Sequence, residues 1–313
     1  MSYIARGRRE ILKVAIVGAG YMGRLHAEKF AARRDARVVA VVDTDAERSR
    51  ALAQRIGCTE TSLEKADAAV VAVPTERHFD VVRECLERGL HVLVEKPIAA
   101  SREQAEALVA LAQKKRRVLQ VGHVERYNGV FSALAARMPR PLYIEAERLS
   151  GFKQRGADVD VVLDLMIHDI DLVLSLSGKD VAGVSACGFR VLTGDIDIAN
   201  ARIEFADGCV ANLSASRVSQ APVRKLRVFQ HEQYVSADLQ AGKLRYVRRA
   251  DGAIESKEEA HEKSDALALQ AQAFVSSVLK DKKPEVSGDD GLRALELALT
   301  VGRLVRERLA RFG

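Results

Sequence analysis

Short apolar runs alternate with longer amphipathic stretches along the first 123 residues. The runs are rich in β-branched side chains and predict buried parallel strands at residues 13–17, 37–42, 67–73, 91–94 and 117–121. The stretches between them predict helices at residues 21–34, 45–57, 75–88 and 101–115, the third with Thr75 as its N-cap and the last with a Ser101–Gln104 capping pattern. Strands that alternate with helices are typical of a doubly wound parallel sheet. We therefore expect an α/β protein that begins with a Rossmann domain over residues 1–123.

The pattern changes after residue 123. A strand is predicted at 143–149, and helices are predicted at 126–138, 164–177, 265–281 and 290–311. Period-two alternation over residues 201–205 and 209–215, with Asp207-Gly208 between them, predicts a β-hairpin, and a second hairpin is expected at Asp251-Gly252. We therefore expect residues 124–313 to form an α+β domain with a mostly antiparallel open sheet.

The first predicted strand ends in three glycines with the spacing G-x-G-x-x-G. Gly18 suits a tight turn, a Cβ at Gly20 would keep a pyrophosphate away from the backbone, and Gly23 lets the following helix pack close to its strand. The next strand ends in Asp43, 20 residues after Gly23, where a carboxylate can bind both hydroxyls of an adenosine ribose. Together these features predict a dinucleotide site. We expect NAD to be preferred over NADP, because Asp43 would repel a 2′-phosphate.

Charge narrows the classes of partner. The formal net charge of +6 is modest, and its densest run, residues 114–117, falls at the end of a predicted helix, where cations interact favourably with the helix dipole. With no tryptophan in the chain and no aromatic residues among these cations, we prefer a solvated helix end over a nucleic-acid site. A basic surface would still attract anionic ligands such as dinucleotides or sugar nucleotides.

Cysteine spacing and the lengths of the apolar runs argue against a metal site, a disulfide framework and a membrane span. The four cysteines show no C-x-x-C pair and no ligand-like spacing with the seven histidines, so we expect neither a metal site nor a disulfide framework. The N-terminus lacks the apolar core of a signal peptide, and no apolar run approaches the roughly 18 residues that a membrane span requires. We expect a cytoplasmic protein without a membrane partner.

Four motifs together resemble the Gfo/Idh/MocA family of sugar oxidoreductases, and the resemblance covers essentially the whole chain. The motifs are the glycine fingerprint with Asp43, Val73-Pro74-Thr75-x-x-His78, Glu95-Lys96-Pro97 and Asp164-x-x-x-His168. The resemblance implies an N-terminal domain that holds NAD and a second domain that binds substrate and forms a homodimer or homotetramer through its open sheet. It also implies that the pocket facing the nicotinamide is lined by Lys96, Asp164 and His168.

These three residues are the candidate catalytic groups. Lys96 falls just after the fourth strand, in the crevice where doubly wound sheets bind ligands, and Pro97 restricts its direction. Asp164 and His168 are four residues apart on a predicted helix and so project from one face. There the histidine can exchange a proton, and the carboxylate can orient it or bind a sugar hydroxyl. Whether Lys96 or His168 is the principal base stays open, as do a plain loop lysine and a capping aspartate beside a core histidine.

The remaining candidates contact cofactor or substrate. Cofactor contacts are predicted at Gly18, Gly20, Tyr21, Met22, Gly23, Asp43, Pro74, Thr75, His78 and Glu95. Substrate contacts are predicted at Lys96, Arg126, Tyr127, Asn128, Asp164 and His168. Arg126 can bind a phosphate or carboxylate, although a purely structural hinge over residues 122–128 is the competing interpretation. A helix-surface His78 and a solvated Arg48 are also left open, and Asp169 and Asp171 interrupt an apolar helix either for a functional reason or on its solvent face.

Within the family, residues 122–128 and 164–171 most resemble enzymes that oxidise C3 of UDP-N-acetylglucosamine to a 3-keto sugar for lipid A or surface-polysaccharide synthesis. That resemblance implies a UDP-sugar substrate and a functional link to a PLP-dependent aminotransferase that acts on the ketone. A dehydrogenase of a free sugar or a polyol such as inositol is the alternative enzyme. A non-catalytic NAD-binding regulatory protein is the alternative from another class, and the presence of both Lys96 and His168 argues against it.

Overall fold

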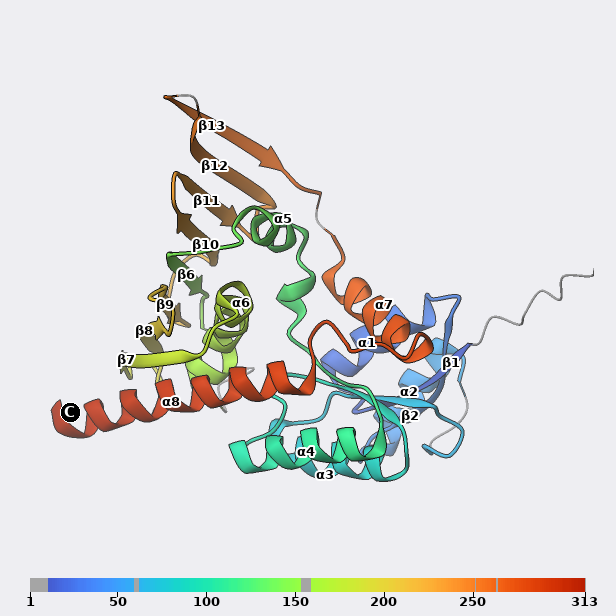
Figure 1. Cartoon of the computed structure of the whole chain (residues 1–313). Coiled ribbons are helices and arrows are strands. Elements are labelled where there is room, and N and C mark those ends of the chain that lie inside the picture. Colours follow the sequence, from blue (N-terminus) through green and yellow to red (C-terminus); the bar gives the residue numbers. More distant parts are fainter. Residues whose placement is uncertain (1–10, 59–61, 153–158, 251, 263, 313) are drawn as a thin grey trace, which may run out of the picture. The chain divides into compact units, whose positions relative to one another are not determined.

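The computed structural model describes residues 11–58, 62–152, 159–250, 252–262 and 264–312. The chain forms two compact units (Figure 1), a first unit of residues 1–122 with 267–292 and a second unit of residues 123–266 with 293–313. Each unit has its own sheet and is described by itself.

The first unit is a doubly wound parallel sheet, as predicted. Its five strands run in the order β2-β1-β3-β4-β5, with β1 (Leu12–Val17), β2 (Ala36–Val42), β3 (Ala68–Val71), β4 (His91–Val94) and β5 (Leu119–Val121). The connecting helices are α1 (Tyr21–Ala31), α2 (Ala46–Ile56), α3 (Thr75–Glu87) and α4 (Arg102–Lys115). The strand order reverses between β1 and β3, and ligands of such sheets bind at the carboxyl ends of the strands beside this reversal.

Local capping chemistry determines where these helices begin and end. α2 starts after Asp45, whose side chain caps it, and stops at the left-handed Gly57, while α4 starts after Ser101, whose hydroxyl accepts from the Gln104 N–H at 3.3 Å. The prediction of Thr75 as an N-cap is wrong, because Pro74 is the last extended residue and Thr75 is already helical.

The segment 267–292 joins the first unit, whereas the sequence placed the domain boundary once, at residue 123. The helix α7 (Ala266–Leu279) explains the difference, since Ala271, Phe274 and Val275 are fully buried in the same core cluster as β1, β2 and α1. The rings of Phe30 and Phe274 meet edge to face, with centroids 6.2 Å apart. Burial of this apolar stripe decides which unit the helix joins.

The second unit is α+β with a mostly antiparallel sheet, as predicted. Its eight strands run in the order β13-β12-β11-β10-β6-β9-β8-β7. They are β6 (Tyr143–Leu149), β7 (Val181–Phe189), β8 (Ile198–Phe205), β9 (Val210–Ser216), β10 (Val223–Gln230), β11 (Gln233–Asp238), β12 (Lys243–Ala250) and β13 (Ala253–Ala260). The pair β6 and β9 is parallel, and the other neighbours are antiparallel. The β8–β9 turn lies at Asp207-Gly208 as expected; Asp251, in the other predicted hairpin, lies outside the described residues.

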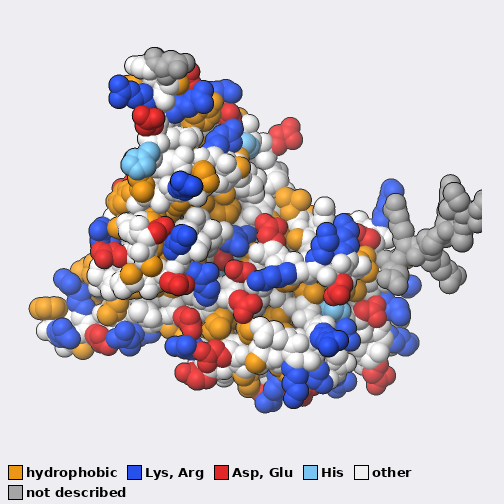
Figure 2. Space-filling model, in the orientation of Figure 1, with side chains coloured by type: hydrophobic (Ala, Val, Ile, Leu, Met, Phe, Trp, Pro, Cys, Tyr) orange, Lys and Arg blue, Asp and Glu red, His pale blue; other side chains and the backbone are white. Residues whose placement is uncertain are grey.

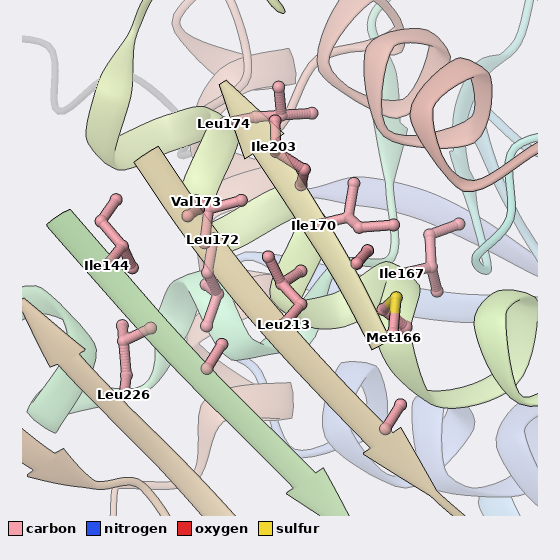
Figure 3. Packing of buried hydrophobic residues seen from close by; sticks show 14 of the residues in the cluster. Ile144, Met166, Ile167, Ile170, Leu172, Val173, Leu174, Ile203, Leu213 and Leu226 are labelled. Atoms are coloured by element: carbon pink, nitrogen blue, oxygen red, sulfur yellow. The ribbon is translucent and has the colours of Figure 1, made fainter. Parts of the chain in front are cut away.

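One face of this sheet forms the core of the second unit. Its buried side chains pack against α5 (Gly129–Arg137), a π-helical turn over Val162–Met166, α6 (Ile167–Ser177) and the later part of α8 (Gly288–Phe312). Figure 3 shows side chains from β6, β8, β9 and β10 gathered with those of α6. On the opposite face, called the outer face here, the half-buried rings of Tyr143, Phe229 and Tyr234 are in contact, with centroids 5.5 and 4.8 Å apart. Arg227 pairs with Glu145 beside them.

Two predicted helices of this unit are interrupted. The helix expected at 126–138 is a 3-10 turn over Val124–Tyr127 followed by α5, because the Asn128 side chain accepts a hydrogen bond from the Val130 N–H at 3.0 Å and starts a new helix. The helix expected at 164–177 begins as the π-helical turn over Val162–Met166, so Asp164 and His168 belong to different helical geometries.

Surface charge is mixed. Basic and acidic side chains are interspersed over the face shown in Figure 2. The run at 114–117 closes α4, with Lys114 and Lys115 in its last turn and the Lys115 ammonium donating to the Glu87 carbonyl at 3.2 Å. Within the part of the chain that the structure describes, every helix is too short or too polar to cross a bilayer.

Candidate functional site

The glycine loop between β1 and α1 leaves room that the protein does not fill. Gly18 has φ +99°, and a Cβ there would lie 2.5 Å from the Ala72 carbonyl oxygen, while a Cβ at Gly23 would overlap the Gly18 carbonyl. Gly20 differs, because its φ is −70° and a Cβ would meet no described atom within 4 Å. The first turn of α1 follows directly, and helix N-termini bind phosphate groups. The loop therefore fits a dinucleotide whose pyrophosphate occupies the space over Gly20.

Asp43 is held at the end of β2 by two backbone donors. Its Oδ2 accepts from the Ala19 N–H at 2.6 Å and its Oδ1 from the Asp45 N–H at 2.8 Å. The first bond ties the carboxylate to the glycine loop, so the groups expected at the pyrophosphate and at the adenosine ribose form one rigid surface. The Arg48 side chain is 64% exposed, as expected for a solvated arginine, and its Nε donates to Asp45 Oδ2 at 2.7 Å.

Glu95, just beyond β4, forms a buried pair with His26 of α1. Glu95 Oε1 lies 2.7 Å from His26 Nε2, and the His26 side chain is 1% exposed. Burial opposes ionisation of the carboxyl group, but the His26 hydrogen bond and the neighbouring Lys96 charge hold the pKa of Glu95 below its ordinary range. A Cβ on Gly122 would lie 3.2 Å from Glu95 Oε1, so any larger residue at position 122 would crowd the carboxylate. The pair connects the helix after the glycine loop with the segment that carries Lys96.

His78 is buried beneath α3 rather than exposed on its surface. Its Nδ1 lies 2.7 Å from the Pro97 carbonyl oxygen and its Nε2 lies 2.9 Å from the Val73 carbonyl oxygen. Burial lowers the pKa of His78. The ring therefore joins the residues that follow β3 to those that follow β4. Lys96 lies within this second segment, is partly exposed, and precedes Pro97 through a cis peptide bond.

Asp164 and His168 lie in the second unit where the π-helical turn passes into α6. π-helical turns occur frequently at functional sites. Both side chains are partly exposed, and the His168 ring meets the ring of His123 edge to face at 6.5 Å. His123 itself is 1% exposed. This contact brings the segment 123–128 next to the start of α6. The predicted substrate contacts in these two segments, namely Arg126, Tyr127, Asn128, Asp164 and His168, need this arrangement in order to form one site.

A buried ionic network, called the Arg148 clamp here, holds these two segments. Arg148 of β6 donates from Nε and Nη2 to Asp169 at 2.8–3.1 Å and from Nη1 to Glu125 at 2.9 Å. The two carboxylates raise the pKa of the Arg148 guanidinium against the opposing effect of burial. Beside the clamp, Arg126 Nε lies 3.9 Å from Asp171 Oδ2. Asp169 and Asp171 therefore face buried arginines and not solvent.

Four residues of this arrangement were missed in the sequence, namely His26, His123, Glu125 and Arg148. Arg148 carries a signal that could have found it, because it shares the core-facing parity of Ile144 and Ala146 in β6 and an arginine there needs a buried acid. His26 and His123 carry no comparable local signal. Among the residues the structure describes, no three His, Cys, Asp or Glu side chains gather as a metal ion would require.

Comparison with known proteins assigns the chain to a family. Residues 12–123 match the oxidoreductase family with an NAD-binding Rossmann fold, and residues 121–235 match the GFO/IDH/MocA C-terminal domain. The chain is also 36% identical, over 96% of its length and 99% of the relative's, to the UDP-N-acetylglucosamine 3-dehydrogenase of Acidithiobacillus ferrooxidans. The chain belongs to the Gfo/Idh/MocA family. It is an oxidoreductase with an NAD-binding Rossmann domain, which confirms the predicted enzyme class and cofactor.

Two solved structures share the fold of this Gfo/Idh/MocA member, and a further relative resembles it in sequence. The A. ferrooxidans enzyme superposes with a TM-score of 0.90 at 35% identity, over 94% of this chain and 98% of that one. The inositol 2-dehydrogenase of Rhizobium meliloti is 26% identical over 95% of this chain and 98% of its own. A scyllo-inositol dehydrogenase of Lactobacillus casei, solved with NAD(H) and scyllo-inositol, has a TM-score of 0.81 at 19% identity, over 96% of this chain and 98% of that one. This last likeness concerns the fold alone.

Proposed function

We propose that the chain is an NAD-dependent dehydrogenase that oxidises the C3 hydroxyl of UDP-N-acetylglucosamine to a 3-keto nucleotide sugar. The observation that carries the proposal is 36% identity to an enzyme of that name along nearly the full length of both chains, against 26% for the inositol 2-dehydrogenase. The UDP-sugar resemblance of residues 122–128 and 164–171 points the same way.

The chemistry divides between the two units. NAD, when bound, supplies the hydride acceptor for the hydrogen on C3. Lys96 or His168 takes the hydroxyl proton as the C3–O double bond forms, and Asp164 orients His168 or binds a sugar hydroxyl. The glycine loop, Asp43, Pro74, Thr75 and Glu95 hold the dinucleotide, whereas the buried His78, predicted as a cofactor contact, instead fixes the segments that follow β3 and β4. The first unit thus binds the cofactor, and the second unit supplies the substrate contacts other than Lys96.

Arg126 and its neighbours are the proposed ligands of the nucleotide diphosphate. The Arg126 side chain is 11% exposed, and its Nε lies 3.9 Å from Asp171 Oδ2. An arginine guanidinium can donate two parallel hydrogen bonds to the oxygens of a diphosphate. Tyr127 follows on the same segment, whereas the Asn128 side chain is already engaged, accepting from the Val130 N–H and donating to the Leu239 carbonyl.

The proposal extends to assembly and to the next enzyme. The outer face of the second unit presents the Tyr143, Phe229 and Tyr234 rings, which suit contact with a second copy of the chain in a homodimer or homotetramer. A 3-keto sugar is a substrate for a PLP-dependent aminotransferase, which would install a 3-amino group for lipid A or a surface polysaccharide. Both reactions would take place in the cytoplasm.

The test incubates the pure enzyme with NAD and UDP-N-acetylglucosamine, with an aminotransferase and an amino donor to remove the ketone. NADH formation and a product mass that corresponds to replacement of the hydroxyl by an amino group are expected. NADH formation with myo-inositol or a free hexose, but not with the nucleotide sugar, would support the polyol alternative. Tight NAD binding without turnover of any of these compounds would support the regulatory alternative.

A further inference from the structure

Two groups near Asp43 could bind a phosphate, the Arg48 guanidinium and the backbone N–H groups in the first turn of α2. The Asp45 side chain forms hydrogen bonds with both. As the N-cap of α2, it accepts at Oδ1 from the Glu47 N–H at 3.0 Å and from the Arg48 N–H at 3.1 Å. Its Oδ2 accepts from Arg48 Nε at 2.7 Å. One carboxylate therefore engages the first turn of the helix and the guanidinium that projects from it.

Asp43 belongs to the same charged cluster. It accepts from the Asp45 N–H, and its charge adds to that of Asp45 in raising the pKa of Arg48. The cluster of Asp43, Asp45 and Arg48 thus contains two carboxylates and one guanidinium at the end of β2. Its formal charge is −1, and its single cation is already paired.

NADP differs from NAD by a 2′-phosphate on the adenosine ribose. Such a group carries a charge of about −2 and binds to arginine forks and to backbone N–H groups at helix N-termini. The chain has an arginine and a helix N-terminus close to Asp43, yet Asp45 holds both. Removing Asp43 alone would leave them occupied.

We propose that Asp45 is a second specificity-determining residue, which excludes 2′-phosphorylated dinucleotides by keeping Arg48 and the first turn of α2 engaged. The inference rests on the proposed contact between Asp43 and the adenosine ribose. A different result is expected if Asp45 serves only as a helix cap, since asparagine caps a helix as well as aspartate does. Replacing Asp45 by asparagine would then leave the affinity for NADP unchanged.

The experiment measures NAD and NADP binding to the full-length protein by isothermal titration calorimetry. Asp45→Asn should strengthen NADP binding about 3- to 10-fold, the effect of freeing one exposed arginine for a phosphate, and should change NAD binding less than about twofold. Glu47→Gln is the matched control, because it removes one exposed negative charge from the same helical turn and leaves the Asp45–Arg48 pair in place. It should change NADP binding less than about twofold.

Arg48→Gln tests whether Arg48 is the group that binds the 2′-phosphate of NADP. In the wild type it should barely change NADP affinity, whereas in the Asp45→Asn background it should remove the gain. Combining Asp43→Ser with Asp45→Asn should increase NADP affinity more than either change alone. Thermal unfolding of each variant checks that the fold is retained.

Three results would overturn the inference. They are an unchanged NADP affinity in Asp45→Asn, an equal gain in Glu47→Gln, and a gain that survives Arg48→Gln. A wild-type protein that binds neither dinucleotide would instead contradict the assignment of the ribose site to Asp43, and with it the premise of the inference.

Discussion

The three glycines after β1 are required for different reasons. Gly18 and Gly23 are needed by the protein itself, because a Cβ on either would collide with a backbone carbonyl. Gly20 has a φ of −70° that any residue can adopt, and a Cβ there would meet open space. Only a ligand explains why this position needs glycine.

Gly20→Ala should therefore separate binding from stability. We expect the free energy of unfolding to fall by only about 0.5–1 kcal/mol, since alanine is a poorer helix N-cap than glycine but its Cβ would meet no described atom. NAD affinity should fall at least about tenfold, because the methyl group takes the place of the pyrophosphate. Calorimetric titration and urea denaturation measure the two quantities. Gly23→Ala is the control and should lose stability; equal destabilisation by both changes would contradict this account of Gly20.

Substitutions at Lys96 and His168 show which of the two residues is the principal base. Lys96→Met should reduce turnover about 10²- to 10⁴-fold, the usual range for loss of a general acid or base, with little change in NAD affinity. Lys115→Met, at an exposed lysine in the last turn of α4, is the control and should leave turnover unchanged. Near-normal turnover in Lys96→Met would remove Lys96 from the chemistry. The larger loss between Lys96→Met and His168→Asn then identifies the principal base.

At the scale of elements, the Arg148 clamp holds a strand, a helix and a 3-10 turn together. Glu125, Arg148 and Asp169 are buried, and each lies on a different element. The neighbours of the clamp in sequence are candidate site residues, Arg126 after Glu125 and His168 before Asp169. The clamp can therefore position the substrate-binding segments without contacting the substrate.

Breaking the clamp should be costly. Arg148→Ala leaves the buried Asp169 without its cation and Glu125 with only the longer ion pair to Arg224 at 3.4 Å, and should lower the free energy of unfolding by about 3–5 kcal/mol. Arg148→Lys keeps the charge but loses the bidentate geometry, so we expect a smaller loss of stability and a raised KM for the sugar nucleotide. Arg202→Ala, which breaks the exposed Arg202–Glu204 pair on β8, should cost less than about 1 kcal/mol. Urea denaturation and steady-state kinetics test this, and equal costs at both arginines would refute a special role for the clamp.

At the scale of the whole molecule, the outer face is the proposed contact between copies of the chain. Phe229→Asp places a charge between Tyr143 and Tyr234 and should lower the molar mass measured by light scattering toward that of a monomer. Phe312→Asp, at an 81% exposed residue at the end of α8, should leave the mass unchanged. Circular dichroism verifies that both variants are folded. A wild-type monomer, or an oligomer that both substitutions leave intact, would show that the outer face is not the contact.

Local features could be predicted from the sequence because their causes are local. The apolar runs predicted the five parallel strands, and the glycine loop and the cap at Ser101 were also correct, since each depends on residues close along the chain. Period-two alternation similarly predicted β8 and β9 and the turn between them. The Gfo/Idh/MocA motifs, including Lys96 and His168, were also readable without coordinates.

Tertiary structure decided what depends on contacts between distant segments. Periodicity could not reveal the π-helical turn at Asp164, which packs against β9, whereas the break before α5 was missed although its cause, the Asn128 cap on Val130, is local. Periodicity could not assign α7 to the first unit, where Phe274 meets Phe30 across more than 240 positions of the chain. The Arg148 clamp likewise joins Glu125, Arg148 and Asp169 from three separate elements. A buried charge obtains its partners only when the fold brings those elements together.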